Sequence, residues 1–204
     1  MEEFIHEFKK NLKPLNSEEK ALKKRIDNNM ENVSPEEYDT FVLGRERDET
    51  ARVAKDKLES FLDKEKEYLG LELGSGTGIY TKELNSIPNL KLIGMDNLRN
   101  MVDFGTAQKR FSKEQVIEGD FHEMSFDENS FDLATGLAIT KQRKDIPKFY
   151  SELKRILKEN GFVFLPFVTS GKKIIEKEIQ LAEENGFEIM EKGDWYILAK
   201  NVKV

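Results

Sequence analysis

The sequence contains no cysteine among its 204 residues. Disulfide bonds, metal sites built on thiolates and a cysteine nucleophile are therefore excluded. The N-terminal stretch MEEFIHEFKKNLKPL also lacks a long apolar run and is charged throughout, so we expect neither a signal peptide nor a membrane span there. Together these absences favour a cytoplasmic protein.

An excess of positive charge is missing as well. The chain has 33 Lys and Arg residues against 39 Asp and Glu residues, which gives a formal net charge of -6 and an isoelectric point of about 5.3. Proteins that bind nucleic-acid phosphates usually carry a basic balance or a basic face, so this composition argues against nucleic acid as a partner. The 38% apolar and 35% charged residues are typical of a soluble globular domain.

Residues 1–66 carry the signals of a helical segment. They are apolar residues at helical spacing from Phe4 to Leu12, a Glu/Lys pattern opening at Ser17, a Ser34 cap followed by Pro35, and a helix over Arg47 to Leu62. We expect this segment either to form a lid over a site or to brace the following domain, which we place at residues 67–204.

From Tyr68 onward, short apolar runs alternate with amphipathic segments, a pattern typical of βαβ units and of a parallel sheet covered on both faces. The predicted strands are 68–73, 90–95, 115–119, 131–137 and 162–168, and the predicted helices between them are 78–87, 98–111 and 146–160. Gly161 is expected to cap the last of these helices. A further helix ending at Asn185 and two strands around a turn at 192–194 predict a closing antiparallel hairpin.

The stretch LELGSGTG, residues 71–78, joins the first predicted strand to a helix. Its glycines, Gly74, Gly76 and Gly78, follow a G-x-G-x-G spacing. A Walker loop would need Lys-Ser/Thr after the turn, and a dinucleotide fingerprint would need G-x-G-x-x-G, so the spacing disfavours both. The loop still allows the backbone to approach a ligand closely.

Carboxylates lie at the ends of three predicted strands: Glu72 beside the glycine loop, Asp96 after LIGM and Asp120 after QVIEG. Because ligands of open α/β sheets bind outside the carboxyl ends of the strands, we expect the three to converge on one crevice. An acidic residue about twenty positions after such a loop is placed to accept ribose hydroxyls. By charge complementarity, the group suits a cationic or neutral nucleoside better than a pyrophosphate.

Four stretches, LELGSGTG, LIGMDNLRNMVDFG, EGDFHEMSFDENSFDLATG and ELKRILKENGFVFL, resemble the successive motifs of the class I S-adenosylmethionine-dependent methyltransferases. The similarity covers roughly Tyr68 to Phe167 and is closest to the small ubiquinone/menaquinone-biosynthesis-like enzymes. It implies an α/β fold with a Rossmann-like, seven-stranded, mostly parallel sheet, a C-terminal antiparallel β-hairpin, helices on both faces and an N-terminal helical extension. It also implies S-adenosyl-L-methionine as cofactor, S-adenosyl-L-homocysteine as product, and in-line transfer of a methyl group.

The resemblance assigns cofactor contacts residue by residue. Glu72, Gly74, Ser75 and Gly76 are implied to line the methionine part, Asp96 to bind the ribose hydroxyls, and Asn97 and Leu98 to flank the adenine. Asp120 is implied to meet the adenine amino group, with the backbone N–H of Phe121 nearby, and the stretch from Thr135 to Ala138 to face the reactive methyl. No catalytic residue and no metal ligand is assigned, because the cofactor itself carries an excellent leaving group.

Three further features of the sequence each allow two interpretations. His122, next to Asp120, invites a role as general base, but the resemblance places it at a surface position on a turn leading away from the cofactor. Tyr38 either reaches over the cofactor or acts as a staple between helices. KQRK, residues 141–144, is either a solvated loop or holds an anionic acceptor through Lys141, Arg143 or Lys144.

The acceptor itself is open. The chain lacks the apolar-His stretch that many similar enzymes carry after the fourth strand, and it lacks the Asn/Asp-Pro-Pro-aromatic motif of enzymes that methylate amino groups of bases or glutamine. We therefore favour a small-molecule acceptor. A protein or RNA methyltransferase, and a protein that holds S-adenosylmethionine without turnover, are the alternatives.

Overall fold

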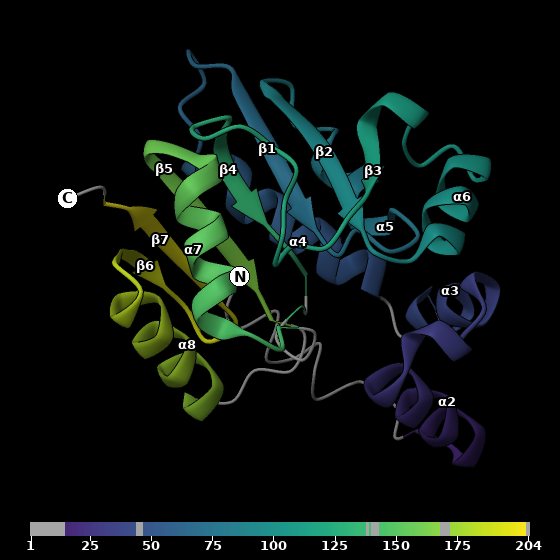
Figure 1. Ribbon diagram of the computed structural model, residues 1–204. Helices are drawn as coiled ribbons and strands as arrows, with labels where there is room; N and C mark the ends of the chain where they lie inside the picture. Colours follow the sequence, from purple (N-terminus) through teal and green to yellow (C-terminus); the bar gives the residue numbers. More distant parts are fainter. Residues whose placement is uncertain (1–14, 44–46, 138, 140–142, 168–171, 203–204) are drawn as a thin grey trace.

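The computed structural model describes residues 15–43, 47–137, 139, 143–167 and 172–202. Within these ranges a seven-stranded sheet has the order β3-β2-β1-β4-β5-β7-β6 (Figure 1). The strands are β1 (Tyr68–Leu73), β2 (Leu90–Asp96), β3 (Val116–Glu118), β4 (Phe131–Thr135), β5 (Leu157–Pro166), β6 (Phe187–Lys192) and β7 (Tyr196–Asn201). β1 to β5 pair in parallel, and β7 runs antiparallel to both of its neighbours. The predicted mostly parallel sheet with a closing antiparallel hairpin is confirmed.

Helices cover both faces of this sheet (Figure 1). α4 (Arg47–Phe61) and α5 (Ile79–Leu84) pack on one face, and α7 (Ile146–Ile156) and α8 (Lys172–Glu184) pack on the other. α6 (Arg99–Ala107) and the short turn η2 (Lys113–Gln115) flank the β2–β3 end of the sheet.

Each face of the sheet has its own hydrophobic cluster, as expected for strands buried on both sides. The cluster under α4 and α5 includes Ala51, Ala54, Leu58, Tyr80, Leu84, Leu92, Leu133 and Phe164. The cluster under α7 and α8 includes Leu71, Leu73, Phe149, Tyr150, Leu153, Ile156, Ile175 and Ala182. The sheet is thereby fixed from both sides, and its carboxyl edge is left free to carry a site.

The N-terminal helices are α2 (Ser17–Asn28), η1 (Met30–Asn32) and α3 (Pro35–Leu43). α3 lies beside α6, and α2 packs against α3 (Figure 1). α2 buries none of its residues, which agrees with its Glu/Lys pattern. Its N-cap is Asn16, whose Oδ1 accepts from the N–H of Glu19 at 2.9 Å. Ser34 caps α3 as predicted, because its Oγ accepts from the N–H of Glu37 at 3.1 Å. The helix predicted between Phe4 and Leu12 lies outside the described residues.

The prediction for residues 146–160 is wrong at its C-terminal end. α7 ends at Ile156 and β5 begins directly at Leu157, so Gly161 lies inside a strand and caps no helix. The register between β4 and β5 shifts at this point, which marks a bulge. A Cβ at Gly161 would lie 2.9 Å from the carbonyl oxygen of Lys158, so glycine is needed there for close backbone packing.

The C-terminus of α7 is capped by a side chain from the far side of the sequence. Asn201, in β7, donates its Nδ2 to the carbonyl oxygens of Lys154, Leu157 and Lys158 at 3.2–3.3 Å. Lys154 stands in the last turn of α7, where a helix leaves carbonyls without intrahelical partners, and Leu157 and Lys158 begin β5. Since the cap comes from another strand, no local signal at residues 157–161 could predict where the helix stops.

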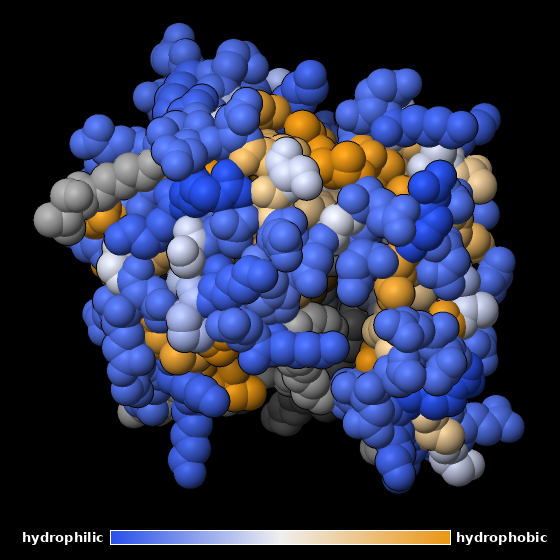
Figure 2. Space-filling model, viewed as in Figure 1, coloured by the Kyte–Doolittle hydropathy of each residue, from blue (hydrophilic) through white to orange (hydrophobic). Residues whose placement is uncertain are grey.

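The face drawn in Figure 2 is mostly hydrophilic, with hydrophobic residues gathered in small separate patches. This agrees with the high share of charged residues in the sequence. Among the residues that the structure describes, none of the helices combines the length and the apolar composition needed to cross a membrane.

Candidate functional site

The glycine loop between β1 and α5 has the backbone conformation that its spacing predicts. Gly74, Gly76 and Gly78 have φ angles of 66°, 54° and 80°, in the left-handed region that glycine adopts most easily. A Cβ at Gly78 would also lie 2.3 Å from the ring of Phe111, so the third glycine is required by packing as well. Backbone conformation and packing therefore both require glycine in this loop.

Asp96, at the end of β2, locks this loop in place. Its Oδ2 accepts from the N–H of Gly76 at 2.8 Å, and its Oδ1 accepts from the N–H of Leu98 at 2.9 Å. Burial raises the pKa of this carboxyl, and the two backbone donors act in the opposite direction. Each oxygen keeps a further lone pair, so Asp96 can hold the loop and still accept hydrogen bonds from a ligand.

Glu72 lies in the floor of the same site. It stands in β1 opposite Thr135 of β4, and it is 1% exposed. Its Oε2 has no hydrogen-bond partner among the described residues. Burial raises the pKa of Glu72 to about 8, the nearby Thr81 hydroxyl acts in the opposite direction, and the Asp96 carboxylate adds a smaller rise. A buried carboxyl left without a partner for one oxygen is costly and is a common mark of a binding or catalytic site.

Tyr80 and Thr135 complete this floor. The Tyr80 hydroxyl lies 3.2 Å from Oγ1 of Thr135, and both side chains are buried. Burial raises the pKa of Tyr80, and the Glu72 carboxylate raises it further, so the phenol keeps its proton. The end of β4 therefore contacts α5, the helix that follows the glycine loop. That Thr135 faces the reactive methyl stays a prediction.

A pocket opens over this floor. It is lined by Tyr38, Val42, Glu72, Gly74, Ser75, Thr77, Ile79, Tyr80 and Leu137. These residues come from α3, β1, the glycine loop, α5 and the segment after β4. A Cβ at Gly76 would lie 3.6 Å from the Tyr38 ring, so this ring stands directly over the loop. Of the two alternatives for Tyr38, the geometry favours the one that covers the site.

An ion pair attaches α3 to the glycine loop. Asp39 accepts from both terminal nitrogens of Arg110, with Oδ1 and Nη1 2.9 Å apart, and Asp39 also accepts from the Thr77 hydroxyl. Arg110 Nη1 in turn donates to the carbonyl oxygen of Thr77 at 3.1 Å. The side chains of Asp39 and Arg110 are 10% and 14% exposed. The helix that carries Tyr38 is thus fastened to the loop it covers.

Residues 71–165 match a family model described as a methyltransferase domain. The sterol 24-C-methyltransferase of Yarrowia lipolytica is 30% identical over 95 residues, which are 45% of this chain and 25% of that protein. The demethylmenaquinone methyltransferase of Thermotoga maritima is 32% identical over 92 residues, which are 45% of this chain and 39% of that protein.

Residues 71–165, just under half of the chain, thus match a methyltransferase domain. The matched stretch spans between a quarter and less than half of the length of these curated relatives. A SAM-dependent methyltransferase of Aquifex aeolicus has the same fold, with a TM-score of 0.62, 16% identity, and coverage of 93% of this chain and 100% of that one. A SAM-dependent methyltransferase of Methanosarcina mazei has a TM-score of 0.59 and 18% identity, and the match covers 72% of this chain and 97% of that one. Both of these solved proteins are named as methyltransferases that depend on SAM, S-adenosyl-L-methionine, as cofactor.

The residues of this methyltransferase domain fit that cofactor. The orphaned Oε2 of Glu72 offers a buried negative charge to a cationic group, and Oγ of Ser75 is likewise buried without a partner in the described chain. Both atoms lie on residues that line the pocket. In the same described ranges, His, Cys, Asp and Glu side chains form no group of three that could hold a metal ion.

The residues expected to face the adenine follow β2 and β3. Asn97 is exposed, and Leu98 is half-buried at the N-cap position of α6. The chain after β3 returns to β2, because the N–H of Gly119 donates to the carbonyl oxygen of Asp96 at 2.9 Å. Asp120 therefore lies at the same edge as Asp96, as predicted. Ala138, at the end of the segment expected to face the methyl, lies outside the described residues.

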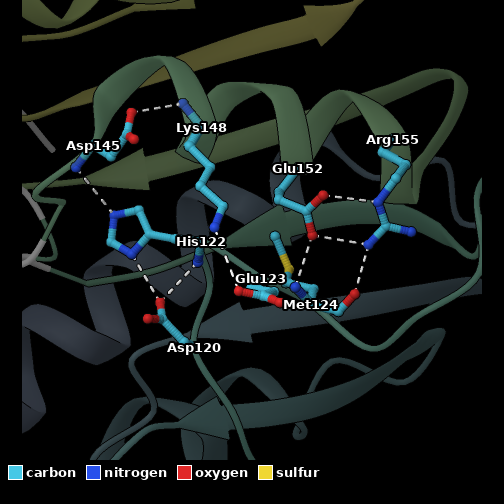
Figure 3. Close-up of polar contacts among 8 residues, drawn as sticks. All are labelled: Asp120, His122, Glu123, Met124, Asp145, Lys148, Glu152 and Arg155. Atoms are coloured by element: carbon cyan, nitrogen blue, oxygen red, sulfur yellow. Dashed lines mark hydrogen bonds and ion pairs between the residues drawn. The ribbon is translucent and has the colours of Figure 1, made fainter.

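His122 is not the surface residue that we expected from the resemblance. Its side chain is 12% exposed, against 58% for Asp120, and its Nδ1 lies 2.8 Å from Oδ1 of Asp120 (Figure 3). The ring packs against Phe121 and Phe149, with ring centroids 4.7 Å and 6.5 Å away. These aromatic contacts bury most of the His122 ring. The contact with α7 that buries it could not be read from the local sequence.

The rest of this turn is also fastened to α7 (Figure 3). The N–H of Met124 donates to Oε2 of Glu152 at 2.7 Å, and Arg155 Nη2 donates to the carbonyl oxygen of Met124 at 2.6 Å. Lys148 reaches Glu123 at 3.4 Å. The loop after β3 is therefore held by one helix along much of its length.

Arg143 does not serve the anionic acceptor for which we considered it. Its guanidinium forms a bidentate ion pair with Glu178 of α8, and the Tyr150 hydroxyl donates to the same carboxylate at 2.6 Å. The side chains of Arg143 and Glu178 are 2% and 4% exposed. The charge of Arg143 is thus used inside the fold. Lys141 lies outside the described residues, and Lys144 is exposed.

We expect Glu178→Ala to lower the free energy of unfolding by about 3–5 kcal/mol, because it leaves the buried guanidinium of Arg143 without its counter-ion. Urea unfolding measures the loss. Glu183→Ala, an exposed change on the same helix, is the matched control and should change stability little. A loss no greater than that of the control would contradict a structural role for this pair.

Proposed function

We propose that this protein transfers the methyl group of S-adenosyl-L-methionine to a small-molecule acceptor and releases S-adenosyl-L-homocysteine. One observation carries the proposal. The unpartnered carboxylate oxygen of Glu72 lies beneath a glycine loop locked by Asp96, in a pocket closed by α3. A buried acid in this place is explained by a cationic ligand, and S-adenosyl-L-methionine carries positive charge at its sulfonium and ammonium groups.

The residues have separate tasks in this proposal. Asp96 accepts hydrogen bonds from the ribose hydroxyls, and Glu72 faces the cationic methionine end. Gly74, Ser75 and Gly76 let the backbone approach the ligand closely. Asn97, Leu98, Asp120 and Phe121 surround the adenine. Tyr38 covers the pocket and excludes water from it, which strengthens every electrostatic contact inside.

The cofactor supplies an activated methyl group whose leaving group is a neutral thioether. In-line transfer would exchange the bond between the methyl carbon and sulfur for a bond between that carbon and the acceptor atom. The task of the chain is to align the acceptor and exclude water, which can supply a large part of the rate. We assign no general base, and Thr135, at the end of β4, is the residue we place nearest the methyl group.

We further propose that the acceptor has an apolar body. The pocket wall around Glu72 contains Val42, Ile79 and Leu137, and its lining includes neither Lys nor Arg in the described chain. Arg143, the strongest candidate for binding an anion, is paired inside the fold. Among the relatives are proteins named for sterol and demethylmenaquinone substrates, both of which are largely apolar.

Calorimetric titration with S-adenosyl-L-methionine and S-adenosyl-L-homocysteine tests the cofactor. We expect both to bind, and Asp96→Ala to weaken both by roughly tenfold to hundredfold, as for lost hydrogen bonds to a charged group. Asp103→Ala, an exposed change on α6, should leave the affinity unchanged. No binding to the wild-type protein, or equal binding by Asp96→Ala, would overturn the proposal.

The acceptor class is tested by a screen that follows S-adenosyl-L-homocysteine formation. The panel should hold apolar phenols, quinols and sterols beside polar amines and carboxylic acids. We expect turnover within the apolar group. Turnover confined to polar or anionic compounds would contradict the acceptor assignment and leave the cofactor assignment intact.

A further inference from the structure

The turn after β3 presents a carboxylate that is held on one side only. Oδ1 of Asp120 accepts two hydrogen bonds from His122, one from its backbone N–H at 2.8 Å and one from ring atom Nδ1 at 2.8 Å (Figure 3). Within the described chain, Oδ2 of Asp120 makes no such hydrogen bond, and the Asp120 side chain is 58% exposed. One oxygen is therefore fixed by the protein and the other faces outward.

The imidazole ring that fixes Asp120 is itself held. The opposite ring atom, Nε2, lies 3.5 Å from the backbone N–H of Asp145 (Figure 3). Asp145 is the N-cap of α7, and its side chain accepts from the N–H of Lys148 at 3.0 Å. Since the Asp145 N–H can only donate, Nε2 is an acceptor, and the proton of a neutral ring is on Nδ1, where it points at Asp120.

The surrounding charges favour an ionised Asp120. Partial burial opposes ionisation, but the hydrogen bonds from His122 and the nearby Lys148 together lower the pKa of Asp120. An ionised carboxylate is an acceptor only. Its outward oxygen is therefore suited to an N–H donor and would repel a carbonyl oxygen.

We propose that His122 is a positioning residue that aims Asp120 at the exocyclic amino group of the cofactor base, and so sets the preference for adenine. The inference rests on the proposed cofactor. His122 acts only through Asp120 and takes no part in methyl transfer. A base with a carbonyl group in place of the amino group would meet Oδ2 of Asp120 oxygen to oxygen.

The experiment compares binding of S-adenosylhomocysteine with S-inosylhomocysteine, which carries that carbonyl, in the wild-type protein and in four variants. We expect the wild-type protein to prefer the adenine compound by roughly tenfold to hundredfold, and Asp120→Asn to lose this preference. His122→Asn places an amide N–H close to the position of Nδ1 and should keep the preference. His122→Gln and His122→Leu lack a donor there and should reduce the ratio by roughly fivefold to tenfold.

The ratio of the two affinities separates positioning from stability. A merely structural role for His122 would weaken both compounds together and leave the ratio unchanged, which would overturn the inference. Equal ratios for His122→Asn and His122→Gln would also overturn it. If His122→Gln does not fold, His122→Leu supplies the same comparison. Failure of the wild-type protein to bind S-adenosylhomocysteine would overturn the proposed cofactor and this inference with it.

Discussion

Replacing Glu72 with glutamine is expected to raise the free energy of unfolding of the cofactor-free protein at alkaline pH. Burial raises the pKa of Glu72 to about 8 in the folded protein, from an ordinary value of 4.5. Between these values the folded state keeps a proton that the unfolded state releases, so wild-type stability falls by about 1.4 kcal/mol per pH unit. Glutamine has no such proton, so the variant should gain at most about 5 kcal/mol over the wild-type protein at high pH.

The pH dependence of the stability difference shows whether the proton on Glu72 causes it. The contribution of protonated Glu72 is complete below pH 4.5 and is lost by about pH 8. Urea unfolding of both proteins at about pH 5, 7 and 9 should therefore show a difference that grows with pH. Glu188→Gln, an exposed change in β6, serves as the control and should show no such trend. A constant difference between wild type and Glu72→Gln would contradict the prediction.

The same variant should bind S-adenosyl-L-methionine more weakly, by roughly tenfold or more, because an amide cannot supply the negative charge that a cation requires. Binding to the wild-type protein near pH 7 should also drive Glu72 to its ionised form and release a proton. Calorimetry in two buffers with different ionisation enthalpies measures this release. We expect it in the wild-type protein and not in Glu72→Gln, and equal proton release by both would contradict the role of Glu72.

Breaking the ion pair between α3 and the glycine loop should lower both the stability of the protein and its affinity for the cofactor. Asp39→Ala leaves the guanidinium of Arg110 largely buried and without its counter-ion, and should cost about 3–5 kcal/mol of stability. Because Arg110 also holds the carbonyl of Thr77, the variant should bind the cofactor more weakly as well.

A double-mutant cycle with Arg110→Ala separates the pair from its surroundings. The double variant should lose less stability than the sum of the two single variants, because neither charge is then left unpaired. Glu37→Ala breaks the exposed pair between Arg25 and Glu37 on the same helices and should have little effect. Simple additivity of Asp39→Ala and Arg110→Ala would show that the two side chains are not coupled.

Features set by a few neighbouring residues could be predicted from the sequence. The left-handed glycines, the Ser34 cap and the alternation of strands and helices all follow from local backbone and side-chain chemistry. The placement of Asp96 beside the loop also followed, because the carboxyl ends of parallel strands share one edge.

Features that depend on distant partners could not be predicted. Asp39, Arg110 and Glu178 stand in charged segments that are indistinguishable by composition from exposed helices, yet each side chain is largely buried against an opposite charge. Arg143 looked like part of a solvated basic loop for the same reason. A single sequence reports the charge of a residue, and it does not report which residue far along the chain will neutralise it.

The place of β7 in the sheet has a consequence for the order in which the domain assembles. β7 follows β6 in the chain but lies between β5 and β6, and its last residue, Asn201, caps α7. β6 therefore has no place in the sheet, and the junction of α7 and β5 has no cap, until β7 has been synthesised. Such long-range pairing slows folding. The half of the sheet that carries Glu72, Asp96 and Asp120 does not depend on β7. We therefore expect these three residues to reach their places before β6 and β7 join the sheet.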